Sequence, residues 1–267
     1  MNADAPIGIF DSGLGGLTVC RAVEAAFPGE DLVYLGDTAR VPYGVKSAET
    51  VTRYSEEICD FLIERGVKAI VVACNTASSL ALPQLRQKYS LPVLGVLEPG
   101  VEAALQACHG GKVGVIGTEA TIRSESYPRA LLKRSPQIQV LSQACPLFVP
   151  LVEEGWIDHP VTREVAEIYV GPWLKLDLDA VILACTHYPL LKGVLQETLA
   201  PEVVWVDSAL ETARALGALL QEAGGLNPRE SGGSRIYYAT DAPQKMQGLA
   251  QAFLGHSLGE VKVIQLN

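Results

Sequence analysis

The chain has 267 residues, of which 48% are hydrophobic and 19% charged, a composition typical of a folded globular protein with room for two small domains. Its net charge of -9 at pH 7, without a concentrated cluster of Lys and Arg, argues against a nucleic-acid partner and favours a small molecule. Residues 1–6 lack the features of a leader peptide, and no apolar run approaches the ~20 residues that span a bilayer, so we expect a cytoplasmic protein with no membrane partner.

The N-terminal part of the chain alternates short apolar runs with segments of helical periodicity, which indicates a parallel sheet. The glycine loop DSGLGG follows the first run, and the loop GDTARVPYG follows the second, where Pro42 and Gly44 disfavour regular structure. Helical spacing resumes at Thr50 and ends at a capping Gly66. We expect strands at 7–10, 32–35, 69–73 and 92–97, and helices at 17–27, at 50–65 and after CNTASS through Tyr89.

The same order of elements begins again at Lys112, where KVGVIGTEAT resembles PIGIFDSGLGG, and DAVILAC later mirrors KAIVVAC. We interpret this pattern as an internal duplication of roughly 110 residues. Further elements are expected as strands within KVGVIGTEAT, at 139–141, within DAVILAC, and at 203–206, 236–239 and 261–266, and as helices at 161–170, at 209–223 and between the last two strands.

The elements after the polar loop at 224–234 have no counterpart in the duplicated unit, so we assign them to the first domain. The predicted fold class is α/β, with two pseudo-symmetric parallel-sheet domains that face each other across a cleft. The first domain is expected to be discontinuous, with residues 1–97 and 208–267, and the second to comprise residues 98–207.

Two of the six cysteines differ from the others. All six should be free thiols in the cytosol, and their spacings, without a C-x-x-C pair, do not suit a structural metal. Cys74 and Cys185 each end an apolar strand and open a polar loop, 111 positions apart. Because ligands bind beyond the carboxyl ends of parallel strands, we expect these two thiols to approach the cleft from opposite sides. A place in the core suits the remaining four, Cys20, Cys59, Cys108 and Cys145.

Two thiols on opposite sides of a carbon atom suit the inversion of a stereocentre. One thiolate removes a proton from one face while the other thiol delivers a proton to the opposite face, so one sulfur must be ionised and the other protonated. A free thiol has a pKa of about 8.5, which neighbouring groups can tune. His187 follows Cys185 closely and could shuttle protons near neutral pH, or it could serve only in the core or in bonding the loop.

Hydroxyl and amide side chains follow the ends of several predicted strands. With backbone N–H groups they would hold a small anionic substrate, although Ser and Thr also cap helices at such places. DSGLGG has Thr18 where a dinucleotide-binding G-x-G-x-x-G needs glycine, which argues against a nicotinamide cofactor. The residues considered for substrate binding are Ser12, Asn75, Thr76, Thr118, Thr121 and Thr186.

Six motifs, in order, resemble those of the glutamate racemases within the aspartate/glutamate racemase superfamily: GIFDSGLGGLTV, YLGDTARVPYG, ACNTASS, GVIGTEATIRSESY, CPLFVPLVEEG and LACTHYPLL. The resemblance covers most of the chain, while roughly the last 55 residues match only loosely. Val41 stands where an aromatic residue is usual and Leu97 where Ile is usual, and both departures are exchanges between apolar residues.

The resemblance implies an enzyme without cofactor, pyridoxal phosphate or metal, which interconverts L- and D-glutamate to supply D-glutamate for peptidoglycan. It implies that Cys74 and Cys185 are the acid/base residues, assisted by Asp11 at the first and by Glu153 and His187 at the second. Family members often dimerise, which leaves a homodimer open. The resemblance implies contacts with substrate at Ser12, Tyr43, Gly44, Asn75, Thr76, Thr186 and His187. We add Asp11, Thr118 and Thr121 to the predicted substrate-binding residues.

Two other functions stay open on the sequence. The same cysteine pair would serve a racemase of aspartate or of another acidic amino acid. A carboxylate-binding or redox protein would instead use the cysteines only for packing or cross-linking. Glutamate is favoured because DTARVPYG and THYPLL match that branch as whole strings.

Overall fold

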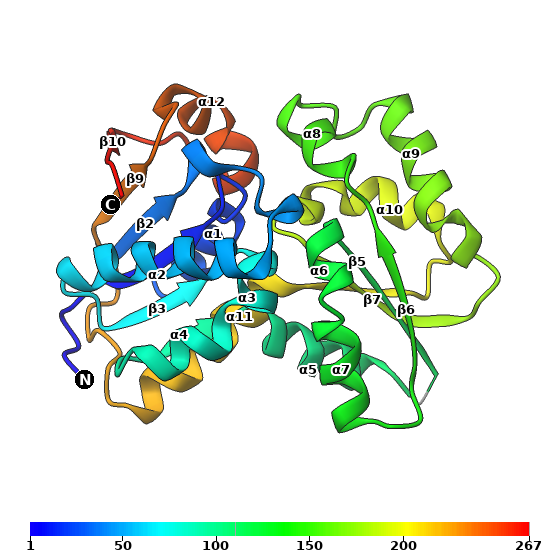
Figure 1. The fold of residues 1–267 in the computed structure, drawn as a ribbon, viewed down its shortest axis with the longest axis horizontal. Helices are drawn as coiled ribbons and strands as arrows, with labels where there is room; N and C mark the ends of the chain where they lie inside the picture. Colours follow the sequence, from blue (N-terminus) through cyan, green and yellow to red (C-terminus); the bar gives the residue numbers. More distant parts are fainter. Residues whose placement is uncertain (110, 267) are drawn as a thin grey trace.

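The computed structural model describes residues 1–109 and 111–266, which form two parallel β-sheets with their helices (Figure 1). The strands of the first sheet are β1 (Ile7–Asp11), β2 (Leu32–Gly36), β3 (Ala69–Val72), β4 (Val93–Gly95), β9 (Arg235–Ala239) and β10 (Val261–Val263). Those of the second sheet are β5 (Lys112–Gly117), β6 (Gln139–Ala144), β7 (Leu178–Ala184) and β8 (Val204–Asp207). We call each sheet with the helices that join its strands the first unit and the second unit.

The two sheets repeat one arrangement of strands. The first has the order β10-β9-β2-β1-β3-β4 and the second the order β6-β5-β7-β8, and all pairings are parallel. In each unit the opening strand therefore lies between the second and third strands, as a duplication requires. The predicted fold class is confirmed, and β9 and β10 extend the first sheet, as expected for the tail. The exact division of the chain, at 97/98 and 207/208, stays a prediction.

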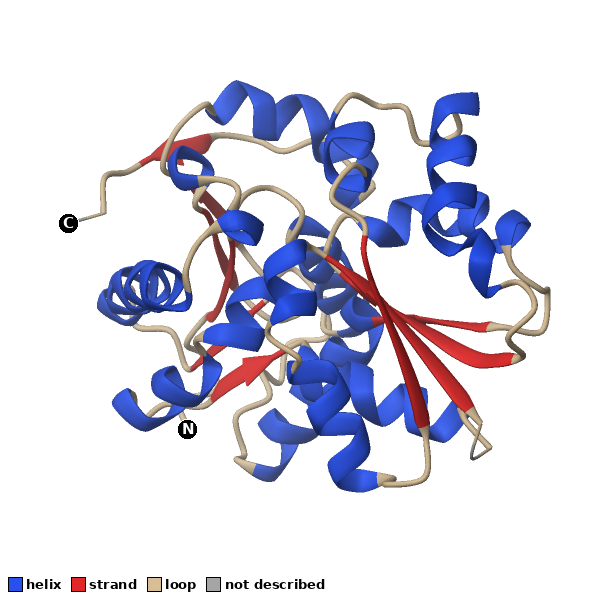
Figure 2. Cartoon of the chain, turned by 45° about the vertical axis from the view of Figure 1, so that its right-hand side comes forward, coloured by secondary structure: helices blue, strands red, loops and turns tan. Residues whose placement is uncertain are grey.

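Helices lie on both sides of the strands (Figure 2). The apolar runs that lead to the two distinctive cysteines are buried for this reason: every residue of β3 is buried, and so is every residue of β7 except Asp179. Strands covered on both faces have continuous rather than alternating apolar sequences. The helices are α1 (Leu17–Ala26), α2 (Ala48–Glu64), α3 (Asn75–Leu80), α4 (Leu82–Lys88), α5 (Leu97–Ala107), α6 (Glu119–Arg123), α7 (Ser126–Arg134), α8 (Phe148–Glu153), α9 (Pro160–Val170), α10 (Lys192–Thr198), α11 (Ser208–Glu222) and α12 (Pro243–Leu254).

Three local predictions around prolines were wrong. The loop expected to lack regular structure contains two short 3₁₀ helices, η1 (Thr38–Arg40) and η2 (Tyr43–Val45), on either side of Pro42. A short 3₁₀ turn needs so few bonds that a neighbouring proline does not prevent it. The polar loop expected at CNTASS is instead the short helix α3, and the helix expected after it is the separate α4, because Pro83 near the start of α4 has no N–H to continue the bonds of α3.

The third wrong prediction was the strand at 92–97. Pairing with β3 ends at Gly95, and Leu97 already begins α5. The sequence EPG suggested a turn, yet Pro99 lies in the first turn of α5, where backbone N–H groups have no partner within the helix. The helix therefore tolerates the proline.

The two units share part of their hydrophobic core. One cluster of buried side chains includes Ile9 and Val71 from the first sheet together with Val181 and Leu183 from the second. Helix α11 follows the last strand of the second unit and packs on both α1 and α5, so it also joins the units. Within residues 1–109 and 111–266, no helix combines the length and apolar character needed to cross a membrane.

Candidate active site

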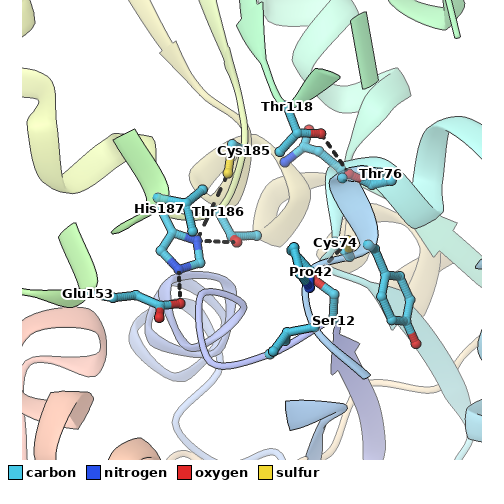
Figure 3. Close-up of a pocket in the computed structure, with 15 residues that line it drawn as sticks. Ser12, Pro42, Cys74, Thr76, Thr118, Glu153, Cys185, Thr186 and His187 are labelled. Carbon is cyan, nitrogen blue, oxygen red and sulfur yellow. Dashed lines mark hydrogen bonds and ion pairs between the residues drawn. The ribbon is translucent and has the colours of Figure 1, made fainter. Parts of the chain in front are cut away.

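A pocket lies where strands of both units end. Cys74 follows β3 by two residues and Cys185 follows β7 directly, so the duplicated strand ends bring both thiols to this pocket. The empty space in and directly above the pocket, including its open mouth, is about 480 Å³. Its lining residues, drawn in Figure 3, are Ser12, Gly13, Val41, Pro42, Tyr43, Gly44, Cys74, Asn75 and Thr76 from the first unit and Thr118, Val149, Glu153, Cys185, Thr186 and His187 from the second.

Cys74 stands at the N-cap of α3 and is bonded only within the first unit. Its thiol donates to Ser12 Oγ, and its sulfur accepts the N–H of Ala77, both at 3.5 Å. Burial raises the pKa of Cys74 to about 11, and the nearby charge of Asp11 adds to this rise, while the contacts with Ser12 and Ala77 oppose it. Cys74 is therefore a thiol at neutral pH.

Cys185 has different neighbours. Its sulfur lies 4.0 Å from Nδ1 of His187, and the exposed fraction of the residue is 6%, against 5% for Cys74. Burial raises the pKa of Cys185 well above its usual value, and the charge of Asp11 adds to the rise, although the backbone N–H of His187 opposes it. One sulfur is thus surrounded by a hydroxyl and an N–H group, and the other by an imidazole.

A chain of polar contacts leads away from Cys185 (Figure 3). His187 Nε2 lies 3.1 Å from Glu153 Oε1, and Lys245 donates to Glu153 Oε2 at 2.6 Å. Burial alone would raise the pKa of Glu153, but the bonds from His187 and Lys245 lower it to about 2. Glu153 is therefore an ionised carboxylate that can orient the imidazole. The ring of Phe253 packs edge-on against the imidazole ring of His187, with the two ring centroids 5.1 Å apart.

Asp11, at the end of β1, lies behind the pocket wall rather than in it. Oδ2 accepts the N–H of Gly13 at 3.0 Å, and the buried Oδ1 has no hydrogen-bond partner among the described residues. Burial raises the pKa of Asp11, against the opposing charge of His187 and the bonds from backbone N–H groups. The charge of Asp11 affects both cysteines, although Asp11 is not among the residues that line the pocket.

Three threonine hydroxyls join the two units beside the pocket. Thr76 Oγ1 lies 3.0 Å from that of Thr118 and 3.2 Å from that of Thr121, and the last two are 3.0 Å apart. Thr121 does not itself line the pocket. Asn75 is fixed by Tyr127, whose hydroxyl donates to Asn75 Oδ1 at 2.5 Å. These side chains are held in place across the boundary between the units.

The loop after β2 forms another wall and is anchored by the buried Asp37. Arg40 donates to Asp37 Oδ2 at 2.7 Å, and the hydroxyl of Tyr43 donates to the same oxygen. The Tyr43 hydroxyl is thus occupied by Asp37, which leaves the ring and backbone of Tyr43 to face the pocket. A Cβ atom on Gly44 would lie 2.9 Å from Cβ of Thr118, so glycine permits this loop to approach the second unit closely.

The pocket brings together nearly all the predicted site residues, but it also contains residues that the sequence did not single out. Gly13, Val41, Pro42 and Val149 line it, and Lys245 supports it from outside. The first three lie inside motifs that the sequence does mark as loops, and Val149 lies in CPLFVPLVEEG. Lys245 belongs to the loosely matching tail and has no local signal.

Among the described residues there is no group of three or more His, Cys, Asp or Glu side chains arranged to hold a metal ion. Within residues 1–109 and 111–266, no two cysteines form a disulfide. Cys20, Cys59 and Cys145 are buried, and Cys108 is half-buried beside Asp179 Oδ2, at 3.0 Å.

Comparisons with known proteins identify consistent relatives. The family model described as Asp/Glu/Hydantoin racemase matches residues 7–216. A glutamate racemase of Geobacter metallireducens is 50% identical over 260 residues, 97% of this chain and 96% of the relative. The crystal structure of glutamate racemase from Francisella tularensis in complex with D-glutamate superposes with a TM-score of 0.93 at 36% identity, covering 99% of each chain. The crystal structure of glutamate racemase from Thermus thermophilus, in complex with beta-chloro-D-alanine, superposes with a TM-score of 0.91 at 47% identity, covering 100% of this chain and 99% of the other.

Proposed function

Because this chain belongs to the Asp/Glu/Hydantoin racemase family, we propose that it interconverts L- and D-glutamate by passing a proton through Cα between Cys74 and Cys185. It is an enzyme of the glutamate racemase class, since relatives of that class match nearly its whole length. The observation that supports the two-thiol route is the shared pocket, to which each unit contributes one cysteine at the end of a matching strand.

The proposed reaction moves one proton off Cα and another onto it. In one direction the Cys74 thiolate takes the proton from Cα, and the electron pair left behind spreads into the α-carboxylate. The Cys185 thiol then gives its proton to the opposite face of Cα, so the configuration is inverted and the two sulfurs have exchanged their protonation states. The other direction runs through the same steps in reverse order.

The raised pKa values of both thiols define what substrate binding must contribute. A buried sulfur becomes ionised more readily when a cation lies nearby. The ammonium group of an amino acid supplies such a cation, so substrate would favour the thiolate that it then reacts with. This explains how two thiols that are protonated at pH 7 can serve as a base.

Hydroxyl, amide and backbone N–H groups at the strand ends would hold the carboxylates of the substrate. Ser12, Asn75 and Thr76 would contribute from the first unit and Thr118 and Thr186 from the second. Donors fixed beforehand by other contacts stabilise the charge that develops during proton removal, because they need no rearrangement. Tyr43 and Gly44 would complete the wall through their backbone, and Thr121 would act through Thr76 and Thr118.

Two groups would assist the thiols. Asp11 would influence Cys74 through its charge from behind the wall, and the Glu153–His187 pair would assist Cys185. His187 lies at the distance of a sulfur contact from Cys185, and it borders the pocket, so it would also contact substrate.

We place this reaction in the cytoplasm, where D-glutamate would supply peptidoglycan synthesis, and we propose a homodimer as the assembly. The route uses no pyridoxal phosphate and no metal ion. We also propose the division of the chain into residues 1–97 with 208–267 and residues 98–207, which separates the two sheets strand by strand.

The test is a measurement of Cα exchange. The purified protein, treated with a chelator and freed of pyridoxal phosphate, should erase the circular dichroism of either enantiomer of glutamate and introduce solvent deuterium at Cα. Cys74→Ala and Cys185→Ala should each lower racemisation by at least about 10³-fold, since each thiol serves one face. Cys59→Ala, which removes a buried thiol that does not line the pocket, should keep the activity while lowering the free energy of unfolding by about 1 kcal/mol.

The outcomes separate the remaining alternatives. A higher kcat/KM for aspartate or another acidic amino acid would transfer the assignment to that substrate within the same chemistry. Carboxylate binding that survives both alanine substitutions, without deuterium at Cα, would instead support a binding or redox protein. The whole-length glutamate relatives favour glutamate over both.

A further inference from the structure

A lysine of the C-terminal helix reaches the polar contacts that lead to Cys185. Lys245 Nζ donates to Glu153 Oε2 at 2.6 Å, and the other oxygen of Glu153 meets the imidazole of His187 at 3.1 Å. In a step that rests on the proposed function, we infer that Lys245 is a positioning residue: it fixes the Glu153 carboxylate, which in turn orients His187 toward Cys185. Figure 1 shows α12 and α8, which carry the two ends of this ion pair, beside each other in different units.

Local helix preferences do not explain where these two charges lie. Lys245 is in the first turn of α12, near the positive end of the helix, and Glu153 is the last residue of α8, near the negative end. Each charge is therefore at the end of its helix that disfavours it. Residues that break a local rule are expected at functional sites, where another interaction compensates. Here the compensating interaction is the pair between the units.

The start of α12 is held firmly enough for such a role. Ala242, just before the helix, has the left-handed conformation with φ of 46°, which is uncommon outside glycine. The preceding turn is bonded to the pocket loop: the N–H of Asp241 donates to Thr38 Oγ1 at 2.9 Å, and Thr240 donates to Asp37 Oδ1 at 2.9 Å. The first turn of α12, which bears Lys245, is thus fixed relative to the wall of the pocket.

A second contact from the same helix acts on the same imidazole. The ring of Phe253 meets that of His187 edge-on, at an interplanar angle of 82°. Helix α12 therefore holds the ring by an apolar contact and, through Lys245 and Glu153, by a polar one. No equivalent chain of contacts leads to Cys74 among the described residues, since that sulfur bonds Ser12 and Ala77. Loss of Lys245 should consequently affect proton transfer at one sulfur only.

The experiment compares Lys245→Met with Lys245→Arg, and with Lys88→Met as a matched control. Lys88 also pairs with a glutamate, Glu56, at 2.8 Å, and neither residue lines the pocket. Lys245→Met should lower kcat about tenfold, the lower range for partners that orient a histidine, with KM changed less than about threefold. Lys245→Arg should restore most of the rate, and Lys88→Met should match the wild type. The melting temperature should change by no more than about 2 °C, because the Lys245 side chain is 54% exposed.

The decisive measurement is the primary kinetic isotope effect with α-deuterated substrate. When transfer at Cys185 is slowed, the primary isotope effect should rise for the enantiomer that Cys185 deprotonates and fall for the enantiomer that Cys74 deprotonates. An unchanged kcat in Lys245→Met, an arginine variant as slow as the methionine variant, or isotope effects that change in the same direction would overturn the inference. Racemisation by the wild type keeps the proposed function intact in each of those cases, whereas a wild type without Cα exchange would defeat both.

Discussion

The two sulfurs that line the pocket have different neighbouring atoms. Cys74 bonds a hydroxyl and a backbone N–H group, and Cys185 faces an imidazole that a carboxylate orients. The duplicated sequence predicts equal positions for the two thiols but not equal surroundings. Thiols with unlike neighbours can differ in reactivity, so the proposed proton transfers at the two faces of the substrate need not be equally fast.

The pH dependence of alkylation tests the protonation state of Cys74. With a pKa of about 11, only about one Cys74 in ten thousand is a thiolate at pH 7, compared with a few per cent of ordinary cysteines. Because raising the pH fills the thiolate form, the rate of alkylation by iodoacetamide should rise about tenfold per pH unit from pH 7 to pH 9. Mass spectrometry of the Cys74 peptide, with a short cysteine peptide as reference, measures this rate. A plateau near pH 8.5 for Cys74 would contradict the raised pKa.

The glycine loop between β1 and α1 contacts a part of the chain that is distant in sequence. DSGLGG resembles a phosphate loop, yet the structure packs it against the second cysteine loop. A Cβ atom on Gly15 would lie 2.5 Å from Nδ1 of His187 and closer still to Thr186 Oγ1. Thr18 adds a hydrogen bond to the carbonyl of Thr186 at 3.2 Å. Glycine is needed here for close approach between the units.

Substitution of this glycine should therefore damage the site. Gly15→Ala should lower activity at least about tenfold and the free energy of unfolding by about 1–3 kcal/mol, because the added methyl group forces the second cysteine loop to move. Gly193→Ala is the matched control: a methyl group there meets nothing within 4 Å in α10, and alanine favours a helix. Steady-state kinetics and urea unfolding should thus find Gly193→Ala fully active and at least as stable as the wild type. A Gly15→Ala enzyme with normal kinetics would show that the loops are not in close contact.

At the scale of the whole molecule, the two units are joined by more than the chain that connects them. The buried cluster containing Ile9 and Leu183 runs through both sheets, and α11 packs on helices of both units. Unfolding of one unit alone would therefore expose part of the hydrophobic core of the other unit to water. The pocket lies at this junction, so any movement that opens it must preserve the shared core.

This continuity predicts cooperative unfolding. Differential scanning calorimetry should give a single transition, with the van't Hoff enthalpy close to the calorimetric one, although many two-domain proteins unfold in two steps. D-glutamate at about 100 times its dissociation constant should add about 2.7 kcal/mol and move that one transition to higher temperature. Two resolved transitions, of which only one responds to glutamate, would mean that the units unfold independently.

Much of this molecule could be predicted from its sequence, since the relevant signals are local. Unbroken apolar runs fix the strands of a sheet covered on both faces, and their repetition gives the two units. Polar residues directly after those strands indicate the site, because parallel strands present their carboxyl ends at one edge. Cys74 and Cys185 are therefore recognisable from their positions along the chain. Helix ends near Pro83 and Pro99 were predicted poorly, as one proline breaks a helix and the other is tolerated according to its position in the turn.

Only the tertiary structure decides which distant groups surround each sulfur. Burial of the thiols, the placement of Asp11 behind the wall and the pairing of Lys245 with Glu153 all depend on how the units and the tail pack. A pKa responds to desolvation and to charges a few ångströms away, and such distances are not encoded in sequence spacing. The sequence by itself determined that two thiols meet at one pocket, and packing between the units decided how each of them is protonated, oriented and supported.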